Sequence, residues 1–399
     1  MASSGCVDRL GARLSPGRRR GPPRIDKHAQ IFLRRQSPPV YVEAVPGHSG
    51  RDNGRGDVNC RGVADHGAVM NPTAQPSDPG TPSLAVPPLF AALAPARSIL
   101  IAGAGGGFDV YAGLPLAFAL WRGGAQVHLA SLSFSELELI DREAWVAEHV
   151  AAVQPDTASP DWYFPERTLA RWLAAQELPS TVYAFPPLGV QPLRAAYRHL
   201  VEHLDVDAVV LVDGGTDVLL RGDESDLGTP VEDITSLAAV AALEVPVKLV
   251  TSLGFGIDAY DGVNHVQVLE NLAALDRDGG YLGALSIPGS SREAALYRDA
   301  VADAQAATPD RPSIVQGQIA AATSGAFGDV RFSRRTRGGD LFVNPLMAIY
   351  FTVDLDKLAA RCLYLDRIEN TIGRRQVITR IQAFRDELLN ARVPRAFPH

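Results

Sequence analysis

Cysteine and lysine are scarce in this chain, and both shortages restrict its chemistry. Only three cysteines occur among 399 residues, too few and too scattered for a disulfide framework or a cysteine-rich zinc site. This cysteine usage fits a reducing compartment, so we expect a cytoplasmic protein. There are also only three lysines, which argues against Schiff-base chemistry. No GxxxxGK[ST] sequence is present, so a P-loop nucleoside triphosphatase is excluded.

Long apolar runs are missing as well. The basic start of the chain is not followed by the continuous apolar segment that a secretory signal needs. Residues 98–121 contain a single charge, Asp109, but a GAGGG sequence in their first third fits a strand, a glycine loop and a helix better than a membrane span. We therefore expect no membrane partner.

The net charge of −7 conceals two unlike parts. Residues 1–83 carry 12 Lys and Arg against 7 Asp and Glu, whereas the rest of the chain carries 26 against 38. An acidic folded part offers no basic face to a phosphate backbone, so we expect no nucleic-acid partner. Residues 1–83 are rich in Arg, Gly, Pro and Ser without an apolar period, which predicts a disordered tail. A start at Met70 would make residues 1–69 an artefact of start-site assignment.

From residue 84 to 399 we predict one α/β domain, a doubly wound, mostly parallel sheet with Rossmann-like helix layers on both faces. Short β-branched runs alternate with helical patterns, and residues 136–178 are predicted to include a helical cap. The predicted strands are 98–103, 126–131, 181–185, 207–213, 246–252, 281–287, 313–316 and 341–353, the last interrupted by Pro345. The predicted helices are 109–122, 190–204, 232–244, 262–276, 291–306 and 373–392.

The glycine loop after the first strand is the sharpest single feature. Glycines between a strand and a helix let the backbone approach an anion, so we predict that Gly103, Gly105, Gly106 and Gly107 bind substrate. Phe108 stands where GxGxxG has its third glycine, and the second strand does not end on an acidic residue, so NAD is not expected. Gly106→Val is predicted to lose ligand binding and keep the fold. Asp109 is either a helix-start cap or a ligand contact.

A second candidate lies after the fourth strand, in the sequence DGGTDVLLRGDES. Carboxylates that converge on one loop suit Mg²⁺ or Mn²⁺, so Asp213, Asp217, Asp223 and Glu224 are predicted metal ligands. Asp109, Asp213 and Asp217 are the predicted catalytic residues. The alternative is a solvated loop in which Arg221 pairs with Asp223 or Glu224. The remaining predicted substrate contacts on this rim are Gly214, Gly215, Thr216, Arg221, Ser252 and Gly254.

Two other patterns have simpler explanations. Thr229 and Glu232 have the spacing of a capping box at the start of a helix. His199 and His203 form an HxxEH pattern, but they flank the apolar stripe of a crossover helix that is remote from the rim. We therefore predict a helix-flank histidine pair in preference to a zinc site.

Together, GAGGGFDVYAGLPLA and VDGGTDVLLRGDESDLGTPVED resemble a prokaryotic domain-of-unknown-function family of Rossmann-like proteins, over most of residues 96–392. The resemblance implies a single α/β domain with both motifs on one rim, and it brings no established activity.

Two functions follow from the residues. The first is a metal-assisted hydrolase, lyase or transferase that acts on a phosphorylated or carboxylated metabolite. The alternative is a non-catalytic Rossmann-like module that binds a nucleotide or metabolite through the glycine loop.

Overall fold

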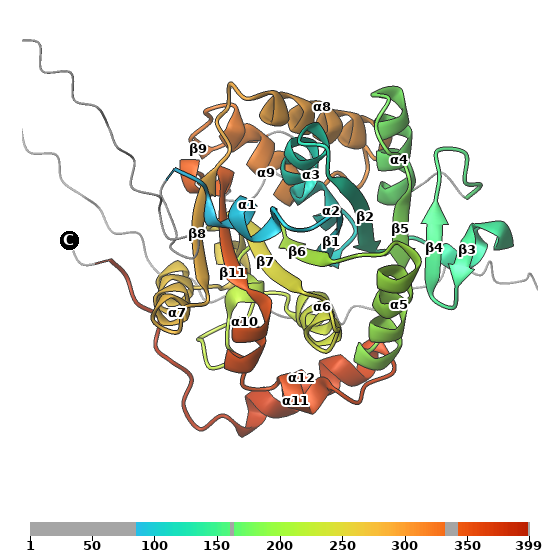
Figure 1. Ribbon diagram of the computed structural model, residues 1–399. Coiled ribbons are helices and arrows are strands. Elements are labelled where there is room, and N and C mark those ends of the chain that lie inside the picture. The colour runs from blue at the N-terminus through green and yellow to red at the C-terminus, as the bar shows by residue number, and fades with distance from the viewer. Residues whose placement is uncertain (1–84, 160–162, 332–341, 398–399) are drawn as a thin grey trace, which may run out of the picture. The chain divides into compact units, whose positions relative to one another are not determined.

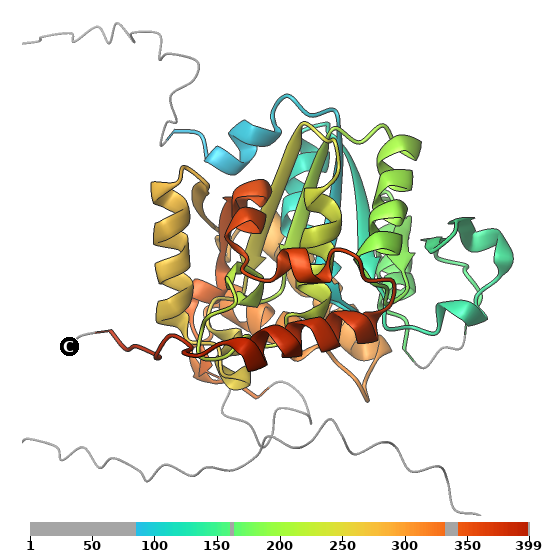
Figure 2. The same cartoon turned by 90° about the horizontal axis from the view of Figure 1, so that it is seen from below.

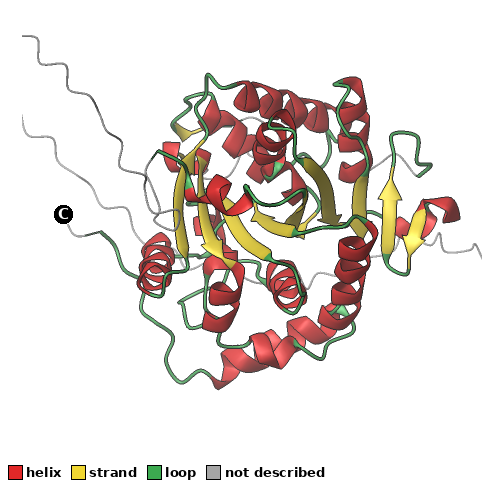
Figure 3. Cartoon of the chain, viewed as in Figure 1, coloured by secondary structure: helices red, strands yellow, loops and turns green. Residues whose placement is uncertain are grey.

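A computed structural model describes residues 85–159, 163–331 and 342–397. The predicted tail, residues 1–83, lies outside these ranges. In the described part of the chain, nine strands form one sheet with the order β3-β4-β5-β2-β1-β6-β7-β11-β8 (Figures 1 and 3). The strands are β1 Ser98–Gly106, β2 Gln126–Leu132, β3 Trp145–Ala147, β4 Val150–Val153, β5 Val182–Phe185, β6 Ala208–Asp213, β7 Val247–Leu253, β8 Tyr281–Ser286 and β11 Ile349–Asp354. A separate pair is formed by β9 Gly328–Asp329 and β10 Phe342–Val343.

Helices cover both faces of this sheet. Figure 1 shows α1, α3, α8 and α9 on one side, and α5, α6, α7, α10, α11 and α12 on the other. Figure 2, turned by 90°, shows α12 lying across the second layer. The α-helices are α1 Pro88–Leu93, α2 Asp109–Ala112, α3 Leu114–Arg122, α4 Pro165–Ala175, α5 Val190–His203, α6 Val231–Ala241, α7 His265–Arg277, α8 Arg292–Ala307, α9 Ile314–Thr323, α10 Leu355–Arg361, α11 Leu365–Ile368 and α12 Arg374–Glu387.

The five central strands, β5, β2, β1, β6 and β7, pair in parallel. Strands buried on both faces read as continuous apolar runs, and β6, with the sequence AVVLVD, is buried at every position. The α/β prediction with a mostly parallel sheet is therefore confirmed. The remaining pairings, β3 with β4, β4 with β5, and β11 with both β7 and β8, are antiparallel.

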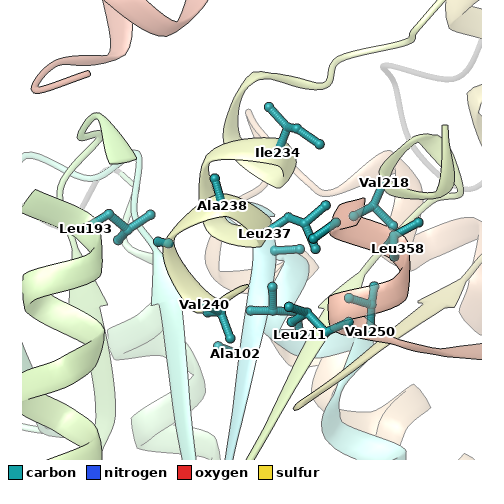
Figure 4. Packing of buried hydrophobic residues seen from close by; sticks show 14 of the residues in the cluster. Ala102, Leu193, Leu211, Val218, Ile234, Leu237, Ala238, Val240, Val250 and Leu358 are labelled. Carbon is teal, nitrogen blue, oxygen red and sulfur yellow. The ribbon is translucent and has the colours of Figure 1, made fainter. Parts of the chain in front are cut away.

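Apolar side chains fill the space between the sheet and each helix layer. On the α6 face, Leu237 and Val240 pack toward Ala102 of β1 and Leu211 of β6, as Figure 4 shows. The opposite face is filled by side chains of α1, α2, α3, α4 and α8, with Tyr111 and Phe118 among the largest. On that face the hydroxyl of Tyr350 on β11 donates to the Ala112 carbonyl, which fastens the antiparallel strand to the end of α2.

One predicted strand, 313–316, is wrong. Ser313 accepts a hydrogen bond from the N–H of Gln316 and so caps α9. A short apolar run of this kind fits a strand or a helix equally well, so periodicity alone does not decide between them. The segment 341–353, predicted as a strand interrupted by Pro345, contains β10 and β11, separated by a 3₁₀ turn at Pro345–Ala348.

The segment 136–178 differs from the predicted helical cap. Its described residues contain two 3₁₀ turns, the β3–β4 hairpin and a single α-helix, α4. The hairpin extends the sheet beyond β5. None of the helices in the described ranges has the length and apolar character that crossing a membrane requires.

The chain changes direction across the sheet between β1 and β6. The connection from β1 leads through α2 and α3 to β2, whereas β6 leads through α6, on the other face, to β7. Helices that leave two adjacent strands toward opposite faces open a crevice at the carboxyl ends of those strands. The two motifs of the sequence, the glycine loop and DGGTD, both lie at this position.

Candidate functional site

Three carboxylates from different elements converge in this crevice. Asp109 begins α2, Asp213 ends β6 and Asp233 lies in the first turn of α6. One carboxylate oxygen from each lies within 4.8 Å of the other two. We call these three residues the carboxylate centre. Its three residues come from the sheet and from a helix on each side of it, and they lie where ligands bind in open α/β folds.

Local structure aims each of the three side chains. The N–H of Gly105 donates to Asp109 Oδ2 at 2.9 Å, which turns this carboxylate back toward the strand that precedes it. Asp213 is the last residue of β6, and the N–H of Val218 donates to its Oδ2 at 3.4 Å. Asp233 precedes Leu237 by four residues, so it lies on the buried stripe of α6. The fold itself therefore brings the three groups together.

Within the described ranges, no side chain balances the charge of this centre. Among the described residues, no Lys, Arg or His forms an ion pair with Asp109, Asp213 or Asp233. Asp213 and Asp233 are 4% and 5% exposed. Burial raises the pKa of Asp109 to about 7, and it raises the pKa of Asp213 and of Asp233 well above the usual range. Neighbouring carboxylates add to all three shifts, because like charges close together disfavour ionisation.

Two further buried aspartates surround the centre, and threonines hold both. Asp217 accepts hydrogen bonds from the N–H and hydroxyl of Thr229 at 2.8 and 3.2 Å. Asp258 Oδ2 accepts from the N–H of Thr216 at 2.5 Å and from its hydroxyl at 3.1 Å. Burial raises the pKa of both carboxyl groups. Asp217, predicted as a metal ligand, is therefore a neighbour of the three-oxygen group and not one of its members.

Several buried polar atoms around the centre lack a hydrogen-bond partner. Asp233 Oδ1, Ser252 Oγ and Gln316 Nε2 are all inaccessible and unpartnered. Ser252 stands directly beside Asp213 in the β6–β7 register, and Gln316 Nε2 lies 3.0 Å from the position that a Cβ on Gly214 would occupy. Buried polar groups almost always find a partner, so these three atoms have hydrogen-bonding capacity that a ligand or water could use.

The glycines of both motifs make room for these side chains. A Cβ at Gly105 would lie 2.3 Å from Asp109 Oδ2 and 3.1 Å from Asp233 Oδ1. At Gly214 it would lie 3.0 Å from Asp109 Oδ1, and at Gly215 it would lie 2.8 Å from Asp258 Oδ1. The bare backbone at these positions lets the carboxylates approach the strand ends. Gly103 and Gly254 instead allow tight packing against Val110 and Ile257.

The glycine loop is not an open anion cradle in this structure. The N–H of Gly105 is used by Asp109, and the N–H of Gly107 donates to the Leu132 carbonyl at 2.9 Å. The space beside Gly106 is occupied by the ring of Phe134, 2.3 Å from where a Cβ would lie. The loop thus shapes the carboxylate centre more directly than it offers donors to a ligand.

The other two predicted metal ligands belong to a separate network. Glu224 is buried and accepts hydrogen bonds from the N–H groups of Arg221 and Gly222, from Asn271 and from Arg392. Asp223 pairs with Arg392 at 2.9 Å and with Arg221 at 3.5 Å. This is the arginine-paired loop that was the alternative to a metal site. Because arginine and backbone donors occupy these oxygens, Asp223 and Glu224 do not fit the role of metal ligands.

The capping box predicted at Thr229 and Glu232 is also corrected. The Thr229 hydroxyl donates to Asp217 instead of capping α6, and Glu232 forms an ion pair with Arg374 of α12. His199 and His203 stack on each other on α5, with ring centroids 5.6 Å apart. Within the described residues, the grouping of metal-binding side chains consists of the three aspartates and includes neither histidine.

Asp233, Asp258 and Gln316 were missed in the sequence. Asp233 carried a readable signal, since an acidic residue four positions before a core leucine lies on the same helical stripe and must be buried. Asp258 follows β7 on the predicted rim. Gln316 was hidden by the assignment of residues 313–316 to a strand.

Residues 100–384 match the model of a family described as protein of unknown function, DUF1152. The comparison with curated proteins found no match, and neither did the comparison with solved structures. The matched residues cover well over half of the chain and include both motifs, the whole carboxylate centre and eight of the nine strands of the sheet in full. This chain therefore belongs to the DUF1152 family.

Proposed function

We propose that the carboxylate centre binds a divalent cation, Mg²⁺ or Mn²⁺, and acts through it on an anionic metabolite. The observation that supports this most directly is the convergence of three carboxylate oxygens from residues that form no ion pair in the described part of the chain. Hard cations of this kind prefer carboxylate oxygens and keep open positions for water or substrate. Asp109, Asp213 and Asp233 would supply the protein ligands.

The charge of the site selects the substrate class. The four buried aspartates and the half-buried Asp109 would repel a free anion, but a bound cation would neutralise part of this charge and bridge to phosphate or carboxylate oxygens. The Gln316 amide and the Ser252 hydroxyl are available to donate to substrate or to metal-bound water. A phosphorylated or carboxylated metabolite, processed by a metal-assisted hydrolase, lyase or transferase, fits these groups.

Metal titration tests the proposal. Isothermal titration of the purified chain with Mn²⁺ is expected to show one site, weakened by at least about tenfold in Asp213→Asn and in Asp233→Asn, since even changes behind a ligand cost about 10–100-fold. Asp386→Asn, an exposed carboxylate on α12, is the matched control and should bind like the parent chain. Equal Mn²⁺ affinity in all of these proteins would overturn the proposal.

A thermal-shift screen then separates an enzyme from a binding module. Sugar phosphates, nucleotides and dicarboxylates are tested with and without Mn²⁺, and ligand at 100 times its Kd is expected to add about 2.7 kcal/mol of stability. Stabilisation that requires Mn²⁺ and disappears in Asp233→Asn supports the metal-assisted function. Stabilisation by a nucleotide that neither requires Mn²⁺ nor changes in Asp233→Asn favours the non-catalytic module.

A further inference from the structure

A second cavity, outside the carboxylate centre, is lined by four arginines. It has a volume of about 340 Å³, and its walls include Arg221, Arg277, Arg361 and Arg392 together with Glu270 and Asn271. These residues come from the loop after β6, from α7, from the end of α10 and from the segment after α12. Figure 1 shows α7 and α10 in the same helix layer, and Figure 2 shows the chain after α12 continuing along it.

Three of the four guanidinium groups are already paired, that of Arg221 only through a 3.5 Å contact with Asp223. Arg392 contacts Asp223, Glu224 and Glu270, and Arg361 lies 3.3 Å from Asp278. These carboxylates hold the arginines in place and leave the cavity wall fixed in shape. A wall whose charged side chains are oriented in advance binds an ion with a smaller loss of side-chain entropy.

Arg221 and Arg277 have donors to spare. Arg221 Nε lies 3.5 Å from Asp223 Oδ1, and within the described ranges its guanidinium makes no hydrogen bond, so its terminal nitrogens are open to a ligand. In the described ranges Arg277 forms no ion pair. A guanidinium offers five N–H donors in a planar fork that matches the paired oxygens of a phosphate or carboxylate.

We propose that this cavity is a second binding site, which takes a small organic anion with phosphate or carboxylate groups. Arg221 and Arg277 supply the donors, and Arg392 and Arg361, held by their carboxylate partners, form the wall beside them. The volume suits a metabolite-sized ligand, since ligand pockets in proteins span about 300–1,000 Å³. Anion binding at this site requires no metal. At the carboxylate centre, by contrast, the proposed function has the anion bind to a cation that the carboxylates hold.

Asn271 joins this cavity to the loop that carries Asp217. Its Nδ2 donates to the Leu219 carbonyl at 3.0 Å and to Glu224 Oε1 at 2.7 Å. The turn Asp217–Leu219 leads directly from β6 toward Arg221. The proposed anion would therefore rest against the same segment that lines the carboxylate centre.

The test uses the full chain in buffer freed of divalent metals by a chelating resin. Pyrophosphate and citrate, titrated calorimetrically, represent the phosphate and carboxylate arms. At least one of them is expected to bind the parent chain. Arg221→Gln/Arg277→Gln should weaken that binding by at least about tenfold, since charge-assisted bonds to an anion contribute strongly. Arg277→Gln alone changes an exposed side chain, keeps the fold and should show part of the loss.

Two controls separate this site from the carboxylate centre. Arg375→Gln removes an exposed arginine of α12 and should leave anion binding unchanged. Asp213→Asn/Asp233→Asn should lose Mn²⁺ binding and retain anion binding. The proposal is overturned if neither anion binds the parent chain or if the arginine double variant binds as the parent does. It is also overturned if Arg375→Gln weakens anion binding as much as Arg221→Gln/Arg277→Gln does. None of these results bears on the Mn²⁺ titration, which tests the proposed function independently.

Discussion

Asp109 Oδ2 accepts the N–H of Gly105, four residues earlier in the chain, at 2.9 Å. The bond closes the end of β1 onto the start of α2 and directs a carboxylate into the crevice between the helix layers. A side chain at Gly105 would occupy the place of that oxygen. The glycine-rich loop is thus part of the apparatus that positions Asp109.

Gly105→Ala is expected to weaken Mn²⁺ binding by about tenfold or more while the protein remains folded. The added Cβ would lie 2.3 Å from Asp109 Oδ2, so the carboxylate has to move. Gly106→Ala is the matched control, because its Cβ would meet only the ring of Phe134, which is 45% exposed and has room to turn. Calorimetric titration and circular dichroism of both variants make the comparison. If Gly106→Ala loses as much affinity as Gly105→Ala, the loop acts as a backbone cradle instead.

Asp233→Asn is expected to stabilise the metal-free protein at pH 8, by on the order of 1 kcal/mol or more. Its pKa is raised by burial and by the charges of Asp217 and Asp109, so ionisation opposes folding above the unfolded-state pKa. Urea unfolding in metal-free buffer measures the change. With Mn²⁺ present the parent chain should be more stable than Asp233→Asn, because the parent gains free energy from metal binding that the variant lacks. A variant that is less stable under both conditions would contradict this account of the centre.

Glu166 is expected to make stability fall as pH rises from about 4.5 to about 7. This side chain at the start of α4 is fully buried, its Oε1 has no partner, and burial raises its pKa to about 7. In that range the folded state holds a proton that the unfolded state has lost, so the cost reaches about 3 kcal/mol above pH 7. Glu166→Gln should remove most of this slope in urea titrations, whereas the exposed Glu244→Gln should not. Parallel slopes for parent and Glu166→Gln would refute the prediction.

Arg392→Met is expected to cost about 3 kcal/mol, the lower end of the range for breaking a buried pair. The guanidinium, 29% exposed, engages the fully buried Glu224 together with Asp223 and Glu270. Without it Glu224 keeps a buried charge with fewer donors. Adding Glu224→Gln should recover part of the loss, which a double-mutant cycle by urea unfolding measures. Additive effects would show that the two side chains act independently.

The sequence predicted the sheet and its rim better than it predicted the site. Seven of the eight predicted strands coincide with strands of the structure, since continuous β-branched runs such as AVVLVD are characteristic of buried parallel strands. The rim followed from topology, and with it Asp109 and Asp213. The sequence did not show which carboxylates of the loop after β6 lie near Asp213. Asp223 and Glu224 are only six or seven residues after Asp217, yet they face Arg392, which is far along the chain.

Asp233 shows what sequence periodicity cannot predict. Its place beside Asp213 depends on how α6 packs over β1, where the Ser236 hydroxyl donates to the Ala104 carbonyl. Sequence periodicity indicates that Asp233 is buried, but it does not say against which strand end. A partner separated by a helix crossing is fixed only by tertiary packing.

The position of β11 has a consequence for synthesis of the chain on the ribosome. In the described sheet β8 pairs only with β11, which lies between it and β7. After β8 emerges, roughly 60 more residues must be translated before Ile349 appears, which takes about 3–12 s at about 5–20 residues per second. During that interval two strand edges have no partner and are open to pairing with another chain. Nascent-chain protection by a chaperone would therefore matter most while residues 287–348 are being made.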